Sequence, residues 1–166
     1  VAASDVYKRQ VLHLKYGYNI PTVSGKIQEK VKSAIETMTG LAVAESPIDA
    51  LSLATLVKRS GGEWRDSHYL SLGGTAPRTM LQFLHNHPHV THLSLCLDND
   101  KAGMEGMERL EQSVQEDAEL AQRVKLIYHN PPPMEFGKDY NEFLCTQIKW
   151  EQDVKHKKIV EYHSAL

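Results

Sequence analysis

Short apolar segments alternate with longer amphipathic ones from residue 41 onward. Four of the short segments predict β-strands: residues 41–44, 69–72, 93–97 and 124–128. The third is the clearest, because its leucines alternate with Ser94 and Cys96 at the two-residue period of a strand.

Three segments between these strands carry apolar residues at helical spacing. Their apolar positions are Ile48, Leu51, Leu53, Ala54, Leu56 and Val57, then Met80, Leu81, Phe83 and Leu84, then Met104, Met107, Leu110 and Val114. Strands that alternate with helices favour an α/β domain with a mainly parallel sheet of about four strands, flanked by helices. The prolines at 131–133 predict a stiff loop, and residues 149–166 predict a C-terminal tail.

The first 40 residues follow a different pattern. Residues 11–15 predict a strand, and apolar positions from Val23 to Met38 predict a helix that ends near Gly40, so residues 11–40 form a βα segment. Residues 4–10 resemble a translated sequencing adapter. Residues 1–10 are therefore either such an artefact or a disordered N-terminus.

Composition narrows the class of protein. The chain has 166 residues, of which 41% are hydrophobic and 24% charged, as in ordinary soluble domains. It has no apolar run long enough to cross a membrane, and Cys96 and Cys145 lack zinc-site spacing, so we expect a reduced, cytoplasmic protein. A net charge of −2 means that binding of DNA would need a local basic surface or partner domains.

Three acidic residues follow predicted strands. Glu45 comes directly after the first strand, and Asp98 and Asp100 come directly after the third. Side chains two residues apart on extended backbone share a face, so the two aspartates can converge. Because close carboxylates repel one another, a bound divalent cation would stabilise them, and an all-oxygen set favours Mg²⁺ or Mn²⁺ over zinc.

Other interpretations of these acids remain open. The segment 98–100 could form a solvated turn, Asp100 could cap the helix that begins near Lys101, and Glu45 could simply favour a helix start. A calcium-binding EF-hand loop is excluded, because its fifth and twelfth positions would be Ala102 and Arg109. The histidines at 85, 87 and 89 favour a solvated helix end over a metal site.

The order of these motifs resembles the Toprim domain of primases, topoisomerases, OLD-type nucleases and recombination proteins. The resemblance covers residues 41–148 and rests on Glu-Ser-Pro-Ile-Asp-Ala-Leu-Ser from Glu45, Leu-Gly-Gly at 72–74, Asp-Asn-Asp at 98–100 and Gly-Lys-Asp-Tyr-Asn-Glu at 137–142. The residues of these motifs are most similar to those in Toprim domains of plasmid and conjugative-element proteins, which are associated with primases or relaxases.

This resemblance implies roles for particular residues. Asp98 and Asp100 would be the principal metal ligands, and Glu45 a further ligand or the general acid/base. An additional set of candidates comprises Asp49, Lys138, Asp139 and Glu142, of which Lys138 would neutralise phosphate charge; for the other three a structural role is an equal alternative. Ser46 departs from the glycine that many Toprim domains carry there, which puts a close backbone approach to phosphate in doubt.

Residues 11–43 instead resemble a fragment of the alkaline-shock protein family, which is unrelated to Toprim and supplies no catalytic residues. We therefore expect that the chain joins two gene fragments near residues 41–44. If so, whether residues 1–43 belong to the same natural protein stays open.

The function implied by the resemblance is Mg²⁺-dependent phosphoryl transfer on DNA, of the primase or topoisomerase type, within a larger mobile-element protein. Its expected partners are DNA, or an RNA primer, and the other domains of that protein. As an isolated piece, the chain is expected to bind metal with little or no turnover. Alternatives are an OLD-like metal-dependent nuclease and a non-catalytic interaction module of a conjugation or relaxase complex.

Overall fold

The computed structural model describes residues 39–164 and the side chains of residues 39–156. The βα segment expected at residues 11–40 and the adapter-like segment therefore lie almost entirely outside the described residues. None of the helices within the described range combines the length and apolar character needed to span a membrane.

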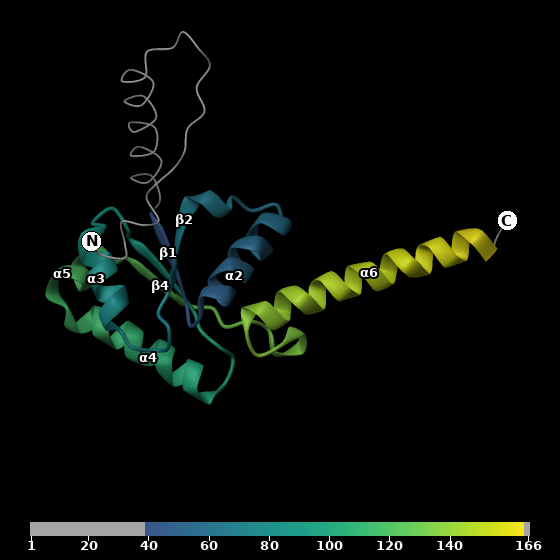
Figure 1. The fold of residues 1–166 in the computed structure, drawn as a ribbon. Helices are drawn as coiled ribbons and strands as arrows, with labels where there is room; N and C mark the ends of the chain where they lie inside the picture. The colour runs from purple at the N-terminus through teal and green to yellow at the C-terminus, as the bar shows by residue number, and fades with distance from the viewer. Residues whose placement is uncertain (1–38, 165–166) are drawn as a thin grey trace, which may run out of the picture. The chain divides into compact units, whose positions relative to one another are not determined.

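A four-stranded, entirely parallel sheet forms the centre of the domain (Figure 1). Its strands are β1 (Gly40–Ala44), β2 (Ser67–Ser71), β3 (His92–Cys96) and β4 (Leu126–His129), in the order β2-β1-β3-β4. The predicted α/β class and parallel sheet are confirmed, with strand ends shifted by one or two residues.

Helices cover both faces of the sheet. They are α2 (Pro47–Arg59), α3 (Arg78–Asn86), α4 (Lys101–Glu116), α5 (Ala118–Arg123) and α6 (Tyr140–Ser164), with short 3-10 turns at Trp64–Asp66 and Met134–Phe136. The helices α3, α4 and α5 lie on one side, and α2 with the start of α6 on the other (Figure 1). The sequence did not predict α5, which follows directly after Asp117; the Asp117 carboxylate caps α5 by accepting from the backbone N–H groups of Glu119 and Leu120.

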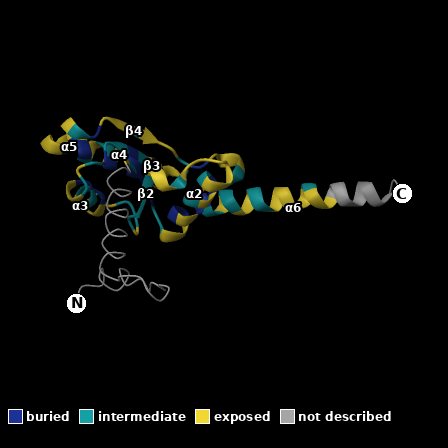
Figure 2. Cartoon of the chain, turned by 90° about the horizontal axis from the view of Figure 1, so that it is seen from above, coloured by how far each residue is buried: buried dark blue, intermediate teal, exposed yellow. Residues whose placement is uncertain are grey.

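Alternation along the strands divides the core into two layers. Leu41, Val43, Leu93 and Leu95 pack toward α3, α4 and α5, whereas Ala42 and Cys96 pack toward α2 and α6. The larger layer is almost fully buried, and Figure 2 shows its buried residues gathered where the helices face the sheet.

Some predicted core positions are wrong. Ile48 and Leu51 are 55% and 70% exposed, because α2 turns Leu53 and Leu56, which were predicted, and Ala50, which was not, toward the sheet. Met104 and Tyr128 are also exposed: Met104 lies on the outer side of α4, and Tyr128 lies on the edge strand β4, beyond the cover of α2. By contrast, Tyr140 is buried and packs with Cys96 and with Leu53 and Leu56 of α2.

The strand order reverses between β1 and β3, at their carboxyl ends. From β1 the chain moves to β2 on one side, and then returns to place β3 on the other side of β1. Ala44 is in register with both Ser71 and Cys96, so the three strands end at the same edge. Ligands of open α/β sheets bind at such a reversal of strand order.

Candidate acidic site at the carboxyl edge of the sheet

Glu45 directly follows β1 at this reversal of strand order, and hydrogen bonds to its carbonyl oxygen hold its backbone. Its carbonyl oxygen accepts from the N–H groups of Gly73 and Gly74, at 2.9 and 3.2 Å, and from the Ser71 hydroxyl at 3.3 Å. Gly73 and Gly74 have φ angles of 66° and 139°, which glycine adopts at little cost. The predicted Gly-Gly turn therefore holds the main chain of the first candidate acid in place.

Asp98 follows β3 and lies among other acids. Its side chain is only 17% exposed, and its Oδ2 atom lies 3.8 Å from the Nζ atom of Lys138. Burial raises the pKa of Asp98 to about 6, and the charges of Glu45, Asp49 and Asp139 contribute to the increase, while Lys138 opposes it. Glu45 is distant from Asp98 in sequence, but its charge contributes to the raised pKa of Asp98 at the carboxyl edge of the sheet.

Asp49 is a buried carboxylate that joins two elements. It is 6% exposed; its Oδ2 atom accepts from the Ser46 hydroxyl at 2.5 Å, and its Oδ1 atom accepts from the backbone N–H of Asn141 at 3.2 Å. Ser46 is the N-cap of α2, and its Oγ in turn accepts from the Asp49 N–H. The serine that departs from the usual Toprim glycine therefore caps α2 and connects it, through Asp49, to the start of α6.

Asp139 and Glu142 stabilise the start of α6. Asp139 accepts from the Glu142 N–H at 2.7 Å, and the Glu142 carboxylate accepts from the Lys138 N–H at 2.8 Å, an arrangement close to a capping box. Gly137 has a φ of 139°, and a Cβ there would overlap the Glu142 side chain. Both acids thus serve the structural role that the sequence left as an alternative, and they orient the loop that carries Lys138.

Asp100 is exposed and caps α4. Its Oδ1 accepts from the Gly103 N–H at 2.9 Å, and it is not among the acids that raise the pKa of Asp98. Within residues 39–156, no three His, Cys, Asp or Glu side chains are already arranged as a set of metal ligands. Glu45 therefore lies close enough to Asp98 for its charge to affect the pKa of Asp98, whereas Asp100 caps α4 through one carboxylate oxygen and leaves the other outside the cap.

The cap and the charge of Asp100 can be separated by mutation. Asparagine caps helices about as well as aspartate, so we expect Asp100→Asn to keep the stability of the domain while Asp100→Ala loses about 1 kcal/mol. If Asp100 also binds Mg²⁺, both variants lose affinity for the ion. Urea denaturation and calorimetry of the two variants measure these effects, and equal stability of both would contradict the capping role.

Asn99 has a role that the sequence did not indicate. Its backbone N–H donates to the Lys138 carbonyl oxygen at 2.7 Å, and its side-chain amide donates to the Pro132 carbonyl oxygen at 2.8 Å. It thereby connects the Asp98 loop to the proline loop and to Lys138. Its position between two aspartates indicated a turn but gave no signal for these distant partners.

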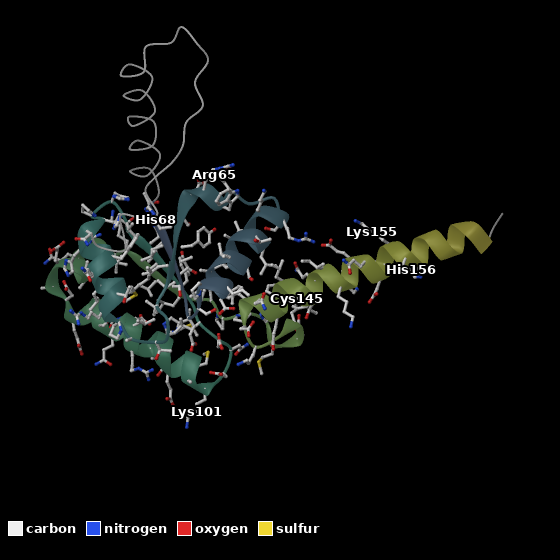
Figure 3. The ribbon with its side chains drawn as sticks, in the orientation of Figure 1. Arg65, His68, Lys101, Cys145, Lys155 and His156 are labelled. Carbon is white, nitrogen blue, oxygen red and sulfur yellow. The ribbon has the colours of Figure 1, made fainter. Side chains whose placement is uncertain are left out.

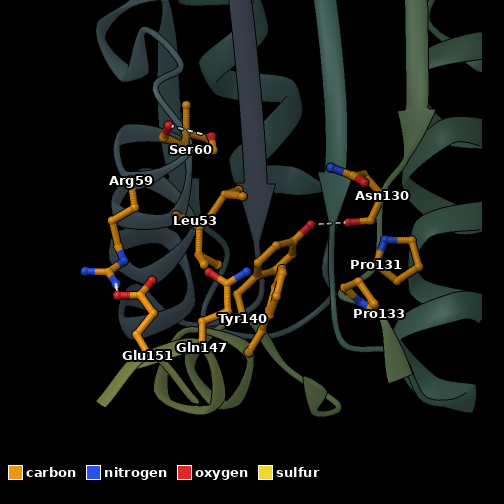
Figure 4. A pocket seen from close by; sticks show the side chains of 12 residues that line it. Leu53, Arg59, Ser60, Asn130, Pro131, Pro133, Tyr140, Gln147 and Glu151 are labelled. Carbon is orange, nitrogen blue, oxygen red and sulfur yellow. Dashed lines mark hydrogen bonds and ion pairs between the residues drawn. The ribbon is translucent and has the colours of Figure 1, made fainter. Parts of the chain in front are cut away.

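A separate hollow of about 500 Å³ opens between α2, α6 and the proline loop (Figure 4). Its lining includes Leu53, Tyr140 and Pro133, and the Arg59–Glu151 ion pair of 2.7 Å lies at its rim. None of Glu45, Asp98 and Asp100 lines it. The three candidate acids therefore lie outside this hollow, beyond the carboxyl ends of β1 and β3.

Comparison with protein families decides the assignment of the fold. Residues 42–144 match the family described as Toprim-like. The chain belongs to the Toprim-like family. Toprim domains in general bind Mg²⁺ and serve phosphoryl transfer on DNA. In this Toprim domain Glu45 and Asp98 follow β1 and β3, the strands between which the strand order reverses.

A second match covers residues 6–50 and is to the alkaline-shock protein family, described as having a cell envelope-related function. This is the family predicted for the N-terminal segment, and its match overlaps the Toprim match at residues 42–50. No curated protein and no solved structure matches the chain.

Proposed function

We propose that this Toprim domain binds Mg²⁺ or Mn²⁺ with Glu45, Asp98 and Asp100 and takes part in phosphoryl transfer on DNA within a larger mobile-element protein. The observation that carries the proposal is that Glu45 and Asp98 follow the strands on either side of the reversal of strand order, where the charge of Glu45 contributes to the raised pKa of Asp98. Carboxylates that repel one another at a ligand-binding edge favour a bound cation.

The donor set fits such an ion. Glu45, Asp98 and Asp100 offer only oxygen ligands, which suit a hard cation such as Mg²⁺. The ion, when bound, would offset the negative charge of a phosphate group. Asp98 and Asp100 would be its principal ligands, and Glu45 a further ligand or the group that accepts and returns a proton.

Basic residues at the same edge support a phosphate substrate. The Lys138 side chain is 57% exposed beside Asp98, and the Lys101 side chain, at the start of α4, is 90% exposed. Figure 3 shows Lys101 at the end of the domain opposite His68, which lies near the start of β2. Because the whole chain carries a net charge of −2, we propose that these two lysines make the local contact to phosphate and that other domains supply the remaining affinity for DNA.

The affinity for Mg²⁺ should depend on pH. The pKa of Asp98 is raised from 3.8 to about 6, so its protonated form is favoured by the fold, and the free domain loses stability as the pH rises from 3.8 through about 6. Mg²⁺ needs the ionised form, so we expect its affinity to rise between about pH 5 and 7, with proton release on binding near pH 6. Calorimetry in buffers of different ionisation enthalpy measures that release.

The proposal is tested by metal titration and by a DNA assay. We expect the chain to bind Mg²⁺ or Mn²⁺, and we expect Asp98→Ala combined with Asp100→Ala to abolish binding; no binding, or unchanged binding in the double variant, would refute the site. Incubation of supercoiled plasmid with Mn²⁺ but without nucleotides distinguishes the nuclease alternative, which predicts nicking. Partner binding that is indifferent to EDTA would favour the interaction module.

A further inference from the structure

Three histidines gather at the amino edge of the sheet, opposite the acidic site. His68 lies near the start of β2, and His87 and His89 lie on the loop between α3 and β3. The imidazole centroid of His68 lies 5.5 Å from that of His87 and 5.6 Å from that of His89, and the centroids of His87 and His89 are 5.8 Å apart. All three are half-buried, so the sequence-based expectation of a solvated helix end is wrong for His87 and His89.

The loop that carries two of these histidines is held by a single arginine. Arg123 of α5 donates to the carbonyl oxygens of Leu84 and Val90 at 2.8 Å and to those of His87 and Pro88 at 3.3 Å. The Arg123 side chain is only 16% exposed. Four carbonyl contacts to one buried guanidinium fix the loop backbone, so His87 and His89 project from a preorganised segment.

His87 presents a free ring nitrogen. Its ring stacks on Phe83 at a centroid distance of 3.9 Å, and its Nδ1 atom lies 2.8 Å from the Phe83 carbonyl oxygen. Because a carbonyl oxygen only accepts, Nδ1 carries the hydrogen, and the lone pair of neutral His87 is on Nε2. Metal-bound histidines are oriented in this way, by donating the other ring N–H to a carbonyl group.

The Nε2 atoms of His68 and His89 are 3.3 Å apart. An N–H···N hydrogen bond between two neutral rings accounts for this distance. The same Nε2–Nε2 distance also equals the separation of about 3.3 Å expected between two nitrogens that bind one tetrahedral ion, each with a metal–nitrogen distance of about 2.0–2.1 Å.

We propose that His68 and His89 bind a divalent cation of intermediate hardness, such as Zn²⁺ or Ni²⁺, at the amino edge of the sheet, with His87 available as a third ligand. Among the described side chains no complete set of three ligands is preformed, so the ion starts with two imidazoles and water. Imidazole favours Zn²⁺, Ni²⁺ and Cu²⁺, whereas the acidic site favours Mg²⁺. The bound ion would join β2 to the α3–β3 loop and stabilise the fold.

The test is a titration of the full chain with Zn²⁺ by calorimetry, with thermal melting as a second readout. We expect one ion per chain, and a loss of affinity of at least about tenfold in His89→Gln and in His68→Gln. His89 lies on a loop, so His89→Gln decides the result if the β2 variant fails to fold. Zn²⁺ should raise the melting temperature of the parent chain but not that of His89→Gln.

His85→Gln is the matched control. His85 lies on the last turn of α3 and pairs with Asp117 and Glu119, at 2.8 and 3.4 Å, instead of with the other histidines. It should keep the parent affinity for Zn²⁺, and His89→Gln should keep the parent response to Mg²⁺, whether or not Mg²⁺ binds at the acidic site. Absence of Zn²⁺ binding, equal affinity in His89→Gln and the parent, or loss in His85→Gln alone would overturn the proposal.

Discussion

Asp98→Asn is expected to lower the affinity for Mg²⁺ about 10–100-fold while raising the melting temperature of the metal-free domain. The amide removes the charge that is both partly buried and repelled by Glu45 and Asp49, and these two effects raise the pKa of Asp98 to about 6. At pH 7 the parent therefore carries an unfavourable ionised group that the variant lacks. The same charge is what a hard cation binds, so affinity and metal-free stability should change in opposite directions.

The measurements are calorimetry with Mg²⁺ and thermal melting at pH 7 in the presence of EDTA. Glu108→Gln is a suitable control, since Glu108 is an exposed acid of α4. It should leave both quantities close to those of the parent. If Asp98→Asn keeps the full affinity for Mg²⁺, Asp98 is not a ligand of the ion. If the variant is less stable than the parent in EDTA, the ionised Asp98 is not an unfavourable charge in the metal-free domain.

That Glu45 and Asp98 share one edge of the sheet could be predicted, because parallel strands end at the same edge. Once Glu45 and Asp98 were assigned to the ends of two parallel strands, the edge they share followed from topology alone. Similarly, the absence of a side chain at Gly103 permits the close approach of α4 to the end of β3, since a Cβ there would overlap the Asp98 carbonyl oxygen. These features depend on residue type and chain direction, which a sequence contains.

The roles of individual acids could not be predicted, because the same residue types suit caps and ligands. Asp100, Asp139 and Glu142 all accept backbone N–H groups at helix starts, and only the coordinates distinguish these bonds from metal contacts. Asp49 is buried through a partner 92 positions away, the Asn141 N–H, which no local pattern encodes.

The apolar pattern of α2 predicted a buried side that was too wide. Leu53 and Leu56 face the sheet as the spacing predicted, but Ile48 and Leu51 of the same apolar set are exposed, and the small residue Ala50 is buried. The start of α2 is held by hydrogen bonds of Ser46 and Asp49, and the bond from the Asn141 N–H to Asp49 comes from a distant part of the chain.

Gly103→Ala and Gly106→Ala form a matched pair on α4. Both replace a buried glycine in the same helix, and alanine favours a helix by about 1 kcal/mol relative to glycine at either position. At Gly106 the added Cβ would meet side-chain atoms of Leu97 and Thr75 at 3.0 and 3.1 Å, which can move by a few tenths of an ångström. We therefore expect Gly106→Ala to change the free energy of unfolding by less than about 1 kcal/mol.

Gly103→Ala should be far more damaging, with a loss of about 2–4 kcal/mol in the free energy of unfolding. Its Cβ would overlap the carbonyl oxygen of Asp98 and lie 2.9 Å from the Asp98 carbonyl carbon, and backbone atoms at the end of a buried strand cannot rotate away. Relief would require α4 to move from β3, which would displace Asp98 and the Asp100 cap, so Mg²⁺ affinity should fall with stability. Urea denaturation and Mg²⁺ calorimetry of both variants measure these effects; equal destabilisation of the pair, or a Gly103→Ala variant as stable as the parent, would contradict the close approach of α4 to the Asp98 backbone.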